Sequence, residues 1–124
     1  MVLVDTSVWI RALSNRADYR ADLDGLLALD QVASHDLVYG ELLAGDRGGR
    51  RAWLGLYGML AQAPVVAHDE VASLVRFRNL HGRGAGWIDM HLLASALVAH
   101  MTLWTADAAL LALAQELDIA YKPR

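Results

Sequence analysis

Short apolar runs alternate with longer amphipathic segments along the whole chain. Three-residue runs at 2–4, 32–34, 65–67, 102–104 and 119–121 predict five strands. Around them, apolar residues recur at spacings of three and four, which predicts helices over 8–13, 19–29, 37–44, 50–62, 70–81, 87–100 and 108–117. Strands that alternate with helices are typical of an α/β fold in which helices cover both faces of a parallel sheet.

The length and composition fit one domain. The 124 residues are 56% hydrophobic, which is enough apolar material for one core, and no repeat or linker divides them. We therefore expect a single domain over residues 1–124. Cysteine is absent, which excludes disulfide bonds and thiolate metal sites and is compatible with a cytoplasmic protein.

The sequence predicts neither a targeting signal nor a membrane segment. The amino terminus lacks basic residues and reaches Asp5 too early for a signal peptide. The apolar stretch 90–104 contains His91 and His100 and is short for a bilayer, so we expect a buried helix that leads into a strand. No membrane partner is expected.

Two acidic residues stand where the predicted strands end. Asp5 directly follows the first strand, and Asp107 follows the fourth after a short turn. In open α/β sheets, ligands bind beyond the carboxyl ends of the strands, so both residues are candidates for a site. Each has a structural alternative, because aspartate is also a common helix cap.

Two further acids interrupt apolar helical faces. The neighbours of Glu41 at helical spacing are Leu37, Val38, Ala44 and Gly45, so Glu41 is expected on the buried side. An ion pair with an arginine or a solvated helix edge is the alternative explanation for it. Asp89 precedes an apolar face and is expected to point inward, although the helix dipole also favours a carboxylate in the first turn.

Four carboxylates from separate elements point to a divalent metal. Mg²⁺ and Mn²⁺ prefer oxygen ligands and relieve the repulsion between carboxylates that lie close together. Such an ion can also assist the hydrolysis of a phosphodiester. The sequence therefore favours a metal-dependent phosphodiesterase that uses Asp5, Glu41, Asp89 and Asp107.

These residues, in this order, resemble the PIN-domain ribonucleases, and in particular the VapC-type toxins of bacterial toxin–antitoxin pairs. The resemblance covers almost the whole chain. It is carried by Val2–Ile10 (VLVDTSVWI), Gly40–Leu43 (GELL), Gly84–Asp89 (GAGWID) ahead of Leu92–Ala96 (LLASA), and Leu103–Asp107 (LWTAD).

The resemblance implies a five-stranded parallel sheet flanked by helices, and Mg²⁺ or Mn²⁺ bound by the four acids. It also implies endonucleolytic cleavage of RNA, a homodimer, and inhibition by a cognate antitoxin that inserts into the site and packs on the early helices. Residues that match supporting or groove positions of the family are Thr6, Ser7 and Thr105 for the metal site, and Leu13, Leu26 and Leu43 for the groove. The chain departs from the family at Ala106, where a basic residue is usual.

Charge placement suggests how RNA is held. The net charge of −3 argues against a positive field over the whole protein, but basic residues gather near the glycine-rich loop 82–86. Arg78, His81 and Arg83 are the expected phosphate contacts.

Two other functions remain as alternatives. A phosphatase with Asp5 as nucleophile would need a second acid two residues later, where the chain has Ser7. A catalytically inert binding module would use the four acids as caps and ion-pair partners.

Overall fold

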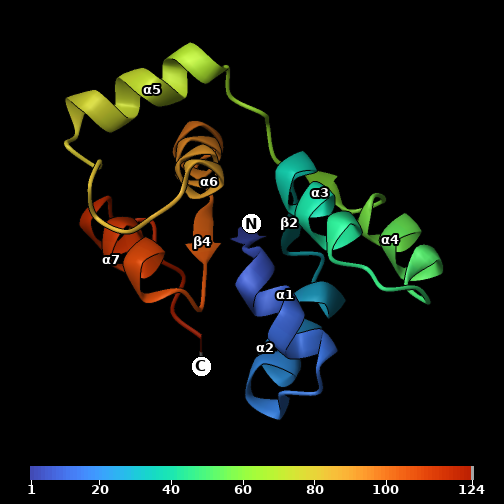
Figure 1. Cartoon of the computed structure of the whole chain (residues 1–124). Coiled ribbons are helices and arrows are strands. Elements are labelled where there is room, and N and C mark those ends of the chain that lie inside the picture. The colour runs from blue at the N-terminus through green and yellow to red at the C-terminus, as the bar shows by residue number, and fades with distance from the viewer. Residues whose placement is uncertain (124) are drawn as a thin grey trace.

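The computed structural model describes residues 1–123 and contains a parallel sheet among helices (Figure 1). The chain runs through β1 (Val2–Val4), α1 (Thr6–Leu13), α2 (Ala17–Ala28), β2 (Val32–Ser34), α3 (Asp36–Ala44), α4 (Arg51–Tyr57), β3 (Ala61–Gln62), α5 (His68–Phe77), α6 (Trp87–Ala99), β4 (Thr102–Trp104) and α7 (Ala108–Glu116). The fold class predicted from the sequence is confirmed.

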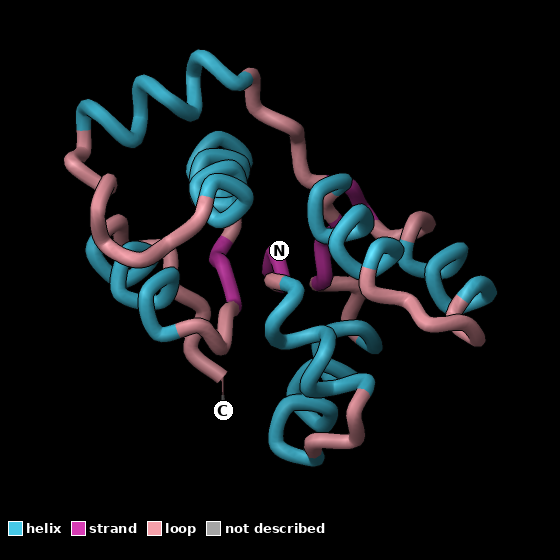
Figure 2. Tube along the Cα trace, in the orientation of Figure 1, coloured by secondary structure: helices cyan, strands magenta, loops and turns pink. Residues whose placement is uncertain are grey.

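The four strands of the sheet lie in the order β3-β2-β1-β4, and all are parallel. Val2 of β1 pairs with Val32 on one side and with Thr102 on the other. The connection after β1 adds strands on one side, whereas β4 returns to the other side. The strand order therefore reverses between β1 and β4, and such a reversal leaves a crevice at the carboxyl ends of the two strands. Figure 2 shows the strands enclosed by helices.

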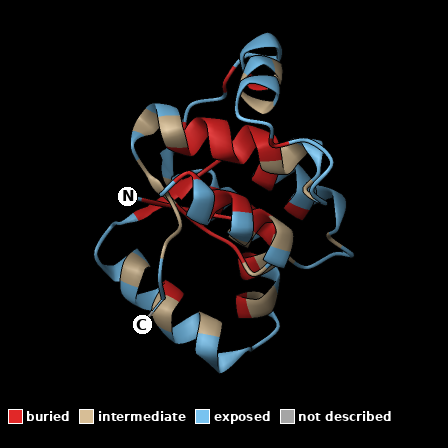
Figure 3. Cartoon of the chain, turned by 90° about the vertical axis from the view of Figure 1, so that its left-hand side faces the viewer, coloured by how far each residue is buried: buried red, intermediate tan, exposed pale blue. Residues whose placement is uncertain are grey.

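The sheet is short and apolar, and the helices bury it. Every residue of β1 and β2 is buried, as expected for strands covered on both faces. The seven consecutive residues Met90–Ala96 of α6 are also all buried (Figure 3). An apolar helix of this kind cannot lie on the surface, and α6 packs against both α5 and β4.

The predicted helix over 50–62 is too long, and the predicted strand at 65–67 is wrong. Helix α4 ends at Tyr57, and the third strand comes earlier, at Ala61–Gln62. Pro64 explains the shift, since it has no N–H to donate and the ladder stops before it. The residues placed in the strand include Val65, which is exposed.

The fifth predicted strand is reduced to one bridge. Ala120 bridges Leu103 in parallel, and Leu103 exchanges backbone hydrogen bonds with Ile119 and Tyr121 at 2.7 and 2.9 Å. Pairing goes no further before Pro123. The segment still extends the sheet beside β4, so the described residues form four strands and this bridge.

None of the helices within residues 1–123 combines the length and apolar character that crossing a bilayer demands.

Candidate functional site

The crevice between β1 and β4 collects acidic residues from four elements. Asp5 follows β1 directly, Asp107 precedes α7, Asp89 lies in the first turn of α6, and Glu41 lies in α3. Because β1 and β4 are adjacent and parallel, the chain segments that leave them emerge side by side. The topology thus explains how residues far apart in sequence reach one place.

Asp5 is held by two hydroxyl groups. Its side chain is only 5% exposed, and its Oδ2 accepts hydrogen bonds from Ser7 Oγ at 2.6 Å and Thr105 Oγ1 at 2.8 Å. Although Asp5 occupies the N-cap position of α1, its side chain makes no capping hydrogen bond. Capping therefore does not explain this aspartate.

The same hydroxyls order the chain that follows β4. Ser7 Oγ accepts from the backbone N–H of Ala106, and Thr105 Oγ1 accepts from that of Asp107, each at 3.0 Å. Ser7 thus donates to Asp5 in its own segment and accepts from the segment that follows β4, whereas Thr105 donates across to Asp5 and accepts from Asp107 in its own segment. This arrangement fixes the start of α7 relative to the end of β1.

Glu41 lies at the edge of α3 and is exposed, so the expectation that it would be buried is wrong. Val38 and Leu42 of α3 face the core. Glu41 directly precedes Leu42, so it lies at the border of the buried face, toward the crevice. Glu41 Oε1 accepts a hydrogen bond of 2.7 Å from Thr6 Oγ1. Within residues 1–123 it forms no ion pair, and Arg47 does not approach it.

Asp89 and Asp107 each bind a helix start through one oxygen. Asp89 Oδ2 accepts from the N–H of Gly86 at 2.9 Å, and the side chain is half-buried. Asp107 Oδ1 accepts from Ala109 and Leu110 at 2.8 and 3.3 Å, so this aspartate does cap α7. The structural alternatives considered for these two residues are therefore partly right.

The four carboxylates are close enough to influence one another. Burial raises the pKa of Asp89 above its ordinary value, and the charges of Asp5, Asp107 and Glu41 raise that pKa further. The hydrogen bond from Gly86 acts in the opposite direction. Repulsion of this kind is what a bound cation would relieve.

Each carboxylate keeps one oxygen available. In the part of the chain that the structure describes, one oxygen of each acid has no hydrogen-bond partner: Oδ1 of Asp5, Oδ1 of Asp89, Oδ2 of Asp107 and Oε2 of Glu41. The donor set is therefore all oxygen and fits Mg²⁺ or Mn²⁺, which keep several water ligands. No three acidic or histidine side chains among residues 1–123 are arranged tightly enough to hold an ion directly. The fit thus relies on water-bridged coordination or on a closer approach of the acids.

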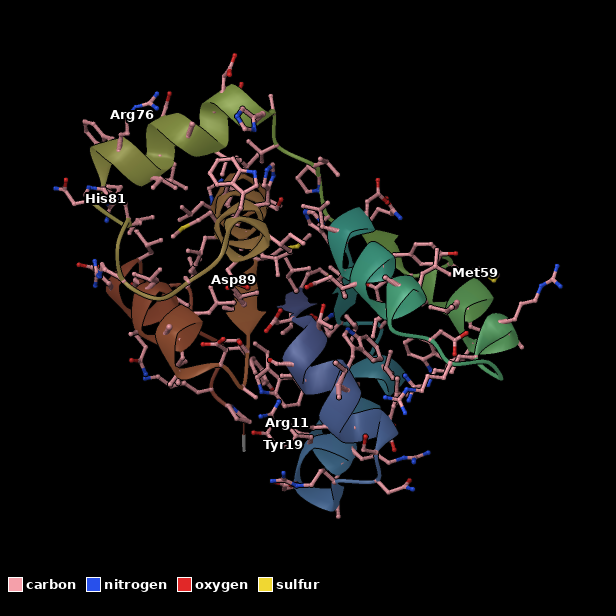
Figure 4. The ribbon with its side chains drawn as sticks, in the orientation of Figure 1. Arg11, Tyr19, Met59, Arg76, His81 and Asp89 are labelled. Atoms are coloured by element: carbon pink, nitrogen blue, oxygen red, sulfur yellow. The ribbon has the colours of Figure 1, made fainter. Side chains whose placement is uncertain are left out.

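The basic residues expected to contact RNA lie beside α5 and its following loop. Arg78, His81 and Arg83 are all exposed, and His81 lies well away from Asp89 (Figure 4). Arg83 Nη1 is 2.7 Å from Glu116 Oε2, so this arginine is paired with α7.

Sequence reasoning missed one cation near the site. Arg11 Nη1 donates a hydrogen bond of 2.9 Å to the backbone oxygen of Ser7, and Arg11 Cζ lies 5.8 Å from the ring centre of Tyr19. The sequence held one sign of this contact, because Arg11 follows Ser7 by four residues and therefore lies on the same face of the helix.

Comparisons with known proteins agree with this architecture. The family model described as PIN domain matches residues 2–116. The chain is 48% identical over 121 residues to "Ribonuclease VapC32" from Mycobacterium tuberculosis strain CDC 1551 / Oshkosh, which is 97% of this chain and 95% of that relative. The protein of the same name from strain ATCC 25618 / H37Rv gives the same figures.

Proposed function

Because this chain belongs to the PIN-domain family of VapC-type ribonucleases, we propose that it is a metal-dependent endoribonuclease that hydrolyses RNA phosphodiester bonds. The observation that carries the proposal is the convergence of Asp5, Glu41, Asp89 and Asp107, each with one uncommitted oxygen. The ribonuclease name of the relatives supports RNA as the substrate.

The residues would hold Mg²⁺ or Mn²⁺ through those uncommitted oxygens. When bound, the ion supplies charge neutralisation among the carboxylates and electrophilic assistance at the phosphate. Ser7 and Thr105 keep Asp5 oriented, and Thr6 does the same for Glu41, so these hydroxyls position ligands.

Asp89 is the residue suited to move a proton. It is half-buried at the acidic crevice, and its Oδ1 has no hydrogen-bond partner within the described residues and is therefore open to a water. Oδ2 meanwhile stays on the N–H of Gly86, which fixes the side chain. Asp89 would therefore reach the ion through a water rather than directly, and its Oδ1 would accept the proton of that water.

Cleavage of a mixed RNA pool by the purified protein tests the proposal. The reaction is run with Mn²⁺, with Mg²⁺ and with chelator, and repeated with Asp89→Asn, which keeps an acceptor for Gly86. Cleavage that needs metal and is lost in the variant supports the proposal. A parallel calorimetric titration with Mn²⁺ is independent of turnover. Absence of both cleavage and metal binding contradicts the proposal.

A catalytically inert PIN-like module is the second candidate, because Asp107 caps α7 and no tight cluster of three ligands exists among residues 1–123. This candidate predicts that the calorimetric titration with Mn²⁺ shows no heat of metal binding. The phosphatase alternative is weaker, since it needs a second acid two residues after Asp5 and the chain has Ser7 there, whose hydroxyl donates to Asp5 Oδ2. A covalent aspartyl-phosphate would support it.

The proposed enzyme is a cytoplasmic toxin that acts as a homodimer and is inhibited by a cognate antitoxin. Exposed apolar residues on the contacting helices α3 and α4 and just after α4 support a groove for the antitoxin: Leu43, Leu56 and Met59 are all exposed. Leu43→Asp should weaken antitoxin binding at least tenfold without loss of cleavage, as measured by calorimetry with the co-expressed partner. Sedimentation at several concentrations tests the dimer.

A further inference from the structure

A cavity of about 360 Å³ lies next to the acidic crevice. It is bounded by α2, by the segment that follows β4 and by the end of the described chain, and its lining includes Tyr19, Trp104, Thr105 and Tyr121. Thr105 belongs to both places, since its hydroxyl donates to Asp5 while the residue lines the cavity. A ligand in the cavity would therefore continue directly into the site.

The lining is a stack of aromatic rings. Tyr19 lies parallel to Trp104, with ring centres 6.2 Å apart and an angle of 18°, and Tyr121 contacts the same indole at 5.2 Å. Trp104 is only 2% exposed, whereas the two tyrosines are half-buried and line the cavity. Flat faces of this kind are what nucleobases stack on, whatever their identity.

Charged side chains lie on and around the cavity, and they differ in whether they are paired. Arg11 lies between Ser7 and the Tyr19 ring, and within residues 1–123 it forms no ion pair. Arg16 also lies over Tyr19 at 5.4 Å, but it is paired with Asp18 at 3.2 Å. The carboxylate of Asp18 lines the cavity and disfavours an anion inside it. A neutral ring inside and a phosphate beside Arg11 satisfy both conditions.

We propose that this cavity binds one nucleobase of the RNA, stacked on Tyr19, while Arg11 contacts the adjoining phosphate. The inference rests on the proposed function, because the nucleotide is part of the RNA that the acidic site would cleave. It assigns to Tyr19 and Arg11 a role in choosing where the strand is cut.

The test uses short oligoribonucleotides that carry 2-aminopurine at each position in turn, bound to Asp89→Asn so that the strand stays intact. Stacking quenches this fluorophore, and we expect strong quenching at one position. Tyr19→Leu should abolish that quenching and weaken binding about tenfold, as loss of one stacked base does. Tyr19→Phe should keep both. Tyr39→Leu is the matched control, because Tyr39 stacks on Tyr57 away from the cavity.

A second variant covers the case in which Tyr19→Leu fails to fold. Leu111→Phe enlarges a half-buried residue that lines the cavity, so it should fill the space and reduce quenching while Tyr19 stays in place. Arg11→Gln should weaken binding but leave the position of quenching unchanged.

The outcomes separate this inference from the proposed function. Unchanged quenching and affinity in folded Tyr19→Leu and in Leu111→Phe overturn the base pocket, while metal-dependent cleavage by the unaltered protein would leave the endoribonuclease proposal standing. Weakened antitoxin binding with unchanged RNA binding would assign the cavity to a protein side chain and overturn the inference. RNA that the unaltered protein neither binds nor cuts contradicts both.

Discussion

The hydroxyl of Thr105 donates a hydrogen bond of 2.8 Å to Oδ2 of Asp5, a residue 100 positions earlier in the chain. The same oxygen of Thr105 accepts from the N–H of Asp107. One side chain thus joins the ends of β1 and β4 and the start of α7, and it determines which oxygen of Asp5 remains available.

Replacing Thr105 should lower activity more than it lowers stability. Thr105→Val keeps the shape but removes the donor to Asp5, so we expect a loss of about 1–2 kcal/mol in the free energy of unfolding. Because an oriented ligand is lost, metal-dependent cleavage should fall roughly tenfold or more. Thr105→Ser retains the hydroxyl and is the control. Equal activity of the valine and serine variants would show that the hydroxyl does not position Asp5.

Removing the charge of Asp89 should stabilise the protein in the absence of metal. Burial and neighbouring carboxylates raise the pKa of Asp89 in the folded state, so its ionised form destabilises the fold at neutral pH. This destabilisation disappears as the pH falls below the pKa of the group in the unfolded chain. Asp89→Asn should therefore raise the melting temperature by about 2 °C at pH 7, since the lost helix-dipole interaction offsets part of the gain. The difference should vanish at pH 3.

Magnesium provides the control for that experiment. Addition of the ion should raise the melting temperature of the unaltered protein more than that of Asp89→Asn, because a ligand is missing in the variant. A variant that is less stable than the unaltered protein at pH 7 would mean that the first-turn position of Asp89 outweighs the repulsion.

His35 should make stability depend on pH. It is fully buried, its Nδ1 accepts from the N–H of Leu37 at the start of α3, and the proton on Nε2 then faces Ser95 Oγ at 2.9 Å. Burial lowers its pKa, the charge of His91 lowers it further, and Asp36 opposes this effect. The folded state therefore keeps His35 neutral at pH values where the unfolded chain, with a pKa of about 6.5, takes up a proton.

Stability should therefore fall as the pH drops below about 6.5. Urea unfolding at pH 7.5 and 5.5 should show a loss of up to about 1 kcal/mol from this residue. His35→Asn can still cap α3 and should lose less over the same range. His91, whose pKa burial also lowers, is present in both proteins and cancels in the comparison. Identical pH dependence in the two proteins would assign the effect elsewhere.

The pairing of Arg83 with Glu116 yields two opposite expectations for RNA affinity. If Arg83 contacts an RNA phosphate, Arg83→Ala should lower the slope of log K against log salt by about 0.7. Glu116→Gln releases the arginine from its partner and should increase affinity about twofold, since exposed pairs are worth under about 1 kcal/mol. If both variants bind RNA as the unaltered protein does, the loop does not contact RNA.

Periodicity and apolar runs were sufficient to predict the sheet and most helices. They placed β1, β2 and β4 at their observed bounds, because the short apolar runs there have no competing helical pattern. The third strand was missed because Ala61–Gln62 is exposed and carries no apolar pattern, and its pairing with Ala33 and Ser34 of β2 is a tertiary interaction.

The grouping of the acids was easier to predict than their individual environments. Strand ends located Asp5 and Asp107, since parallel strands bring their carboxyl ends together. The exposure of Glu41 was mispredicted, because helical neighbours at spacings of three and four do not reveal which side of α3 packs on the core. The hydroxyl contacts of Thr6, Ser7 and Thr105 depend on distances that no spacing rule supplies.

The position of β4 beside β1 has a consequence for the order in which activity appears during synthesis. The first seven elements leave the ribosome carrying Asp5 and Glu41, but the crevice has no second wall, and Asp5 lacks its donor Thr105, until the segment that contains Thr102–Trp104 emerges and pairs with Val2–Val4. If the protein cuts RNA, a nascent chain carries only half of the cutting site while it is still attached to the machinery that makes it. Such a chain would have no complete site with which to cut its own messenger until β4 has emerged and paired with β1.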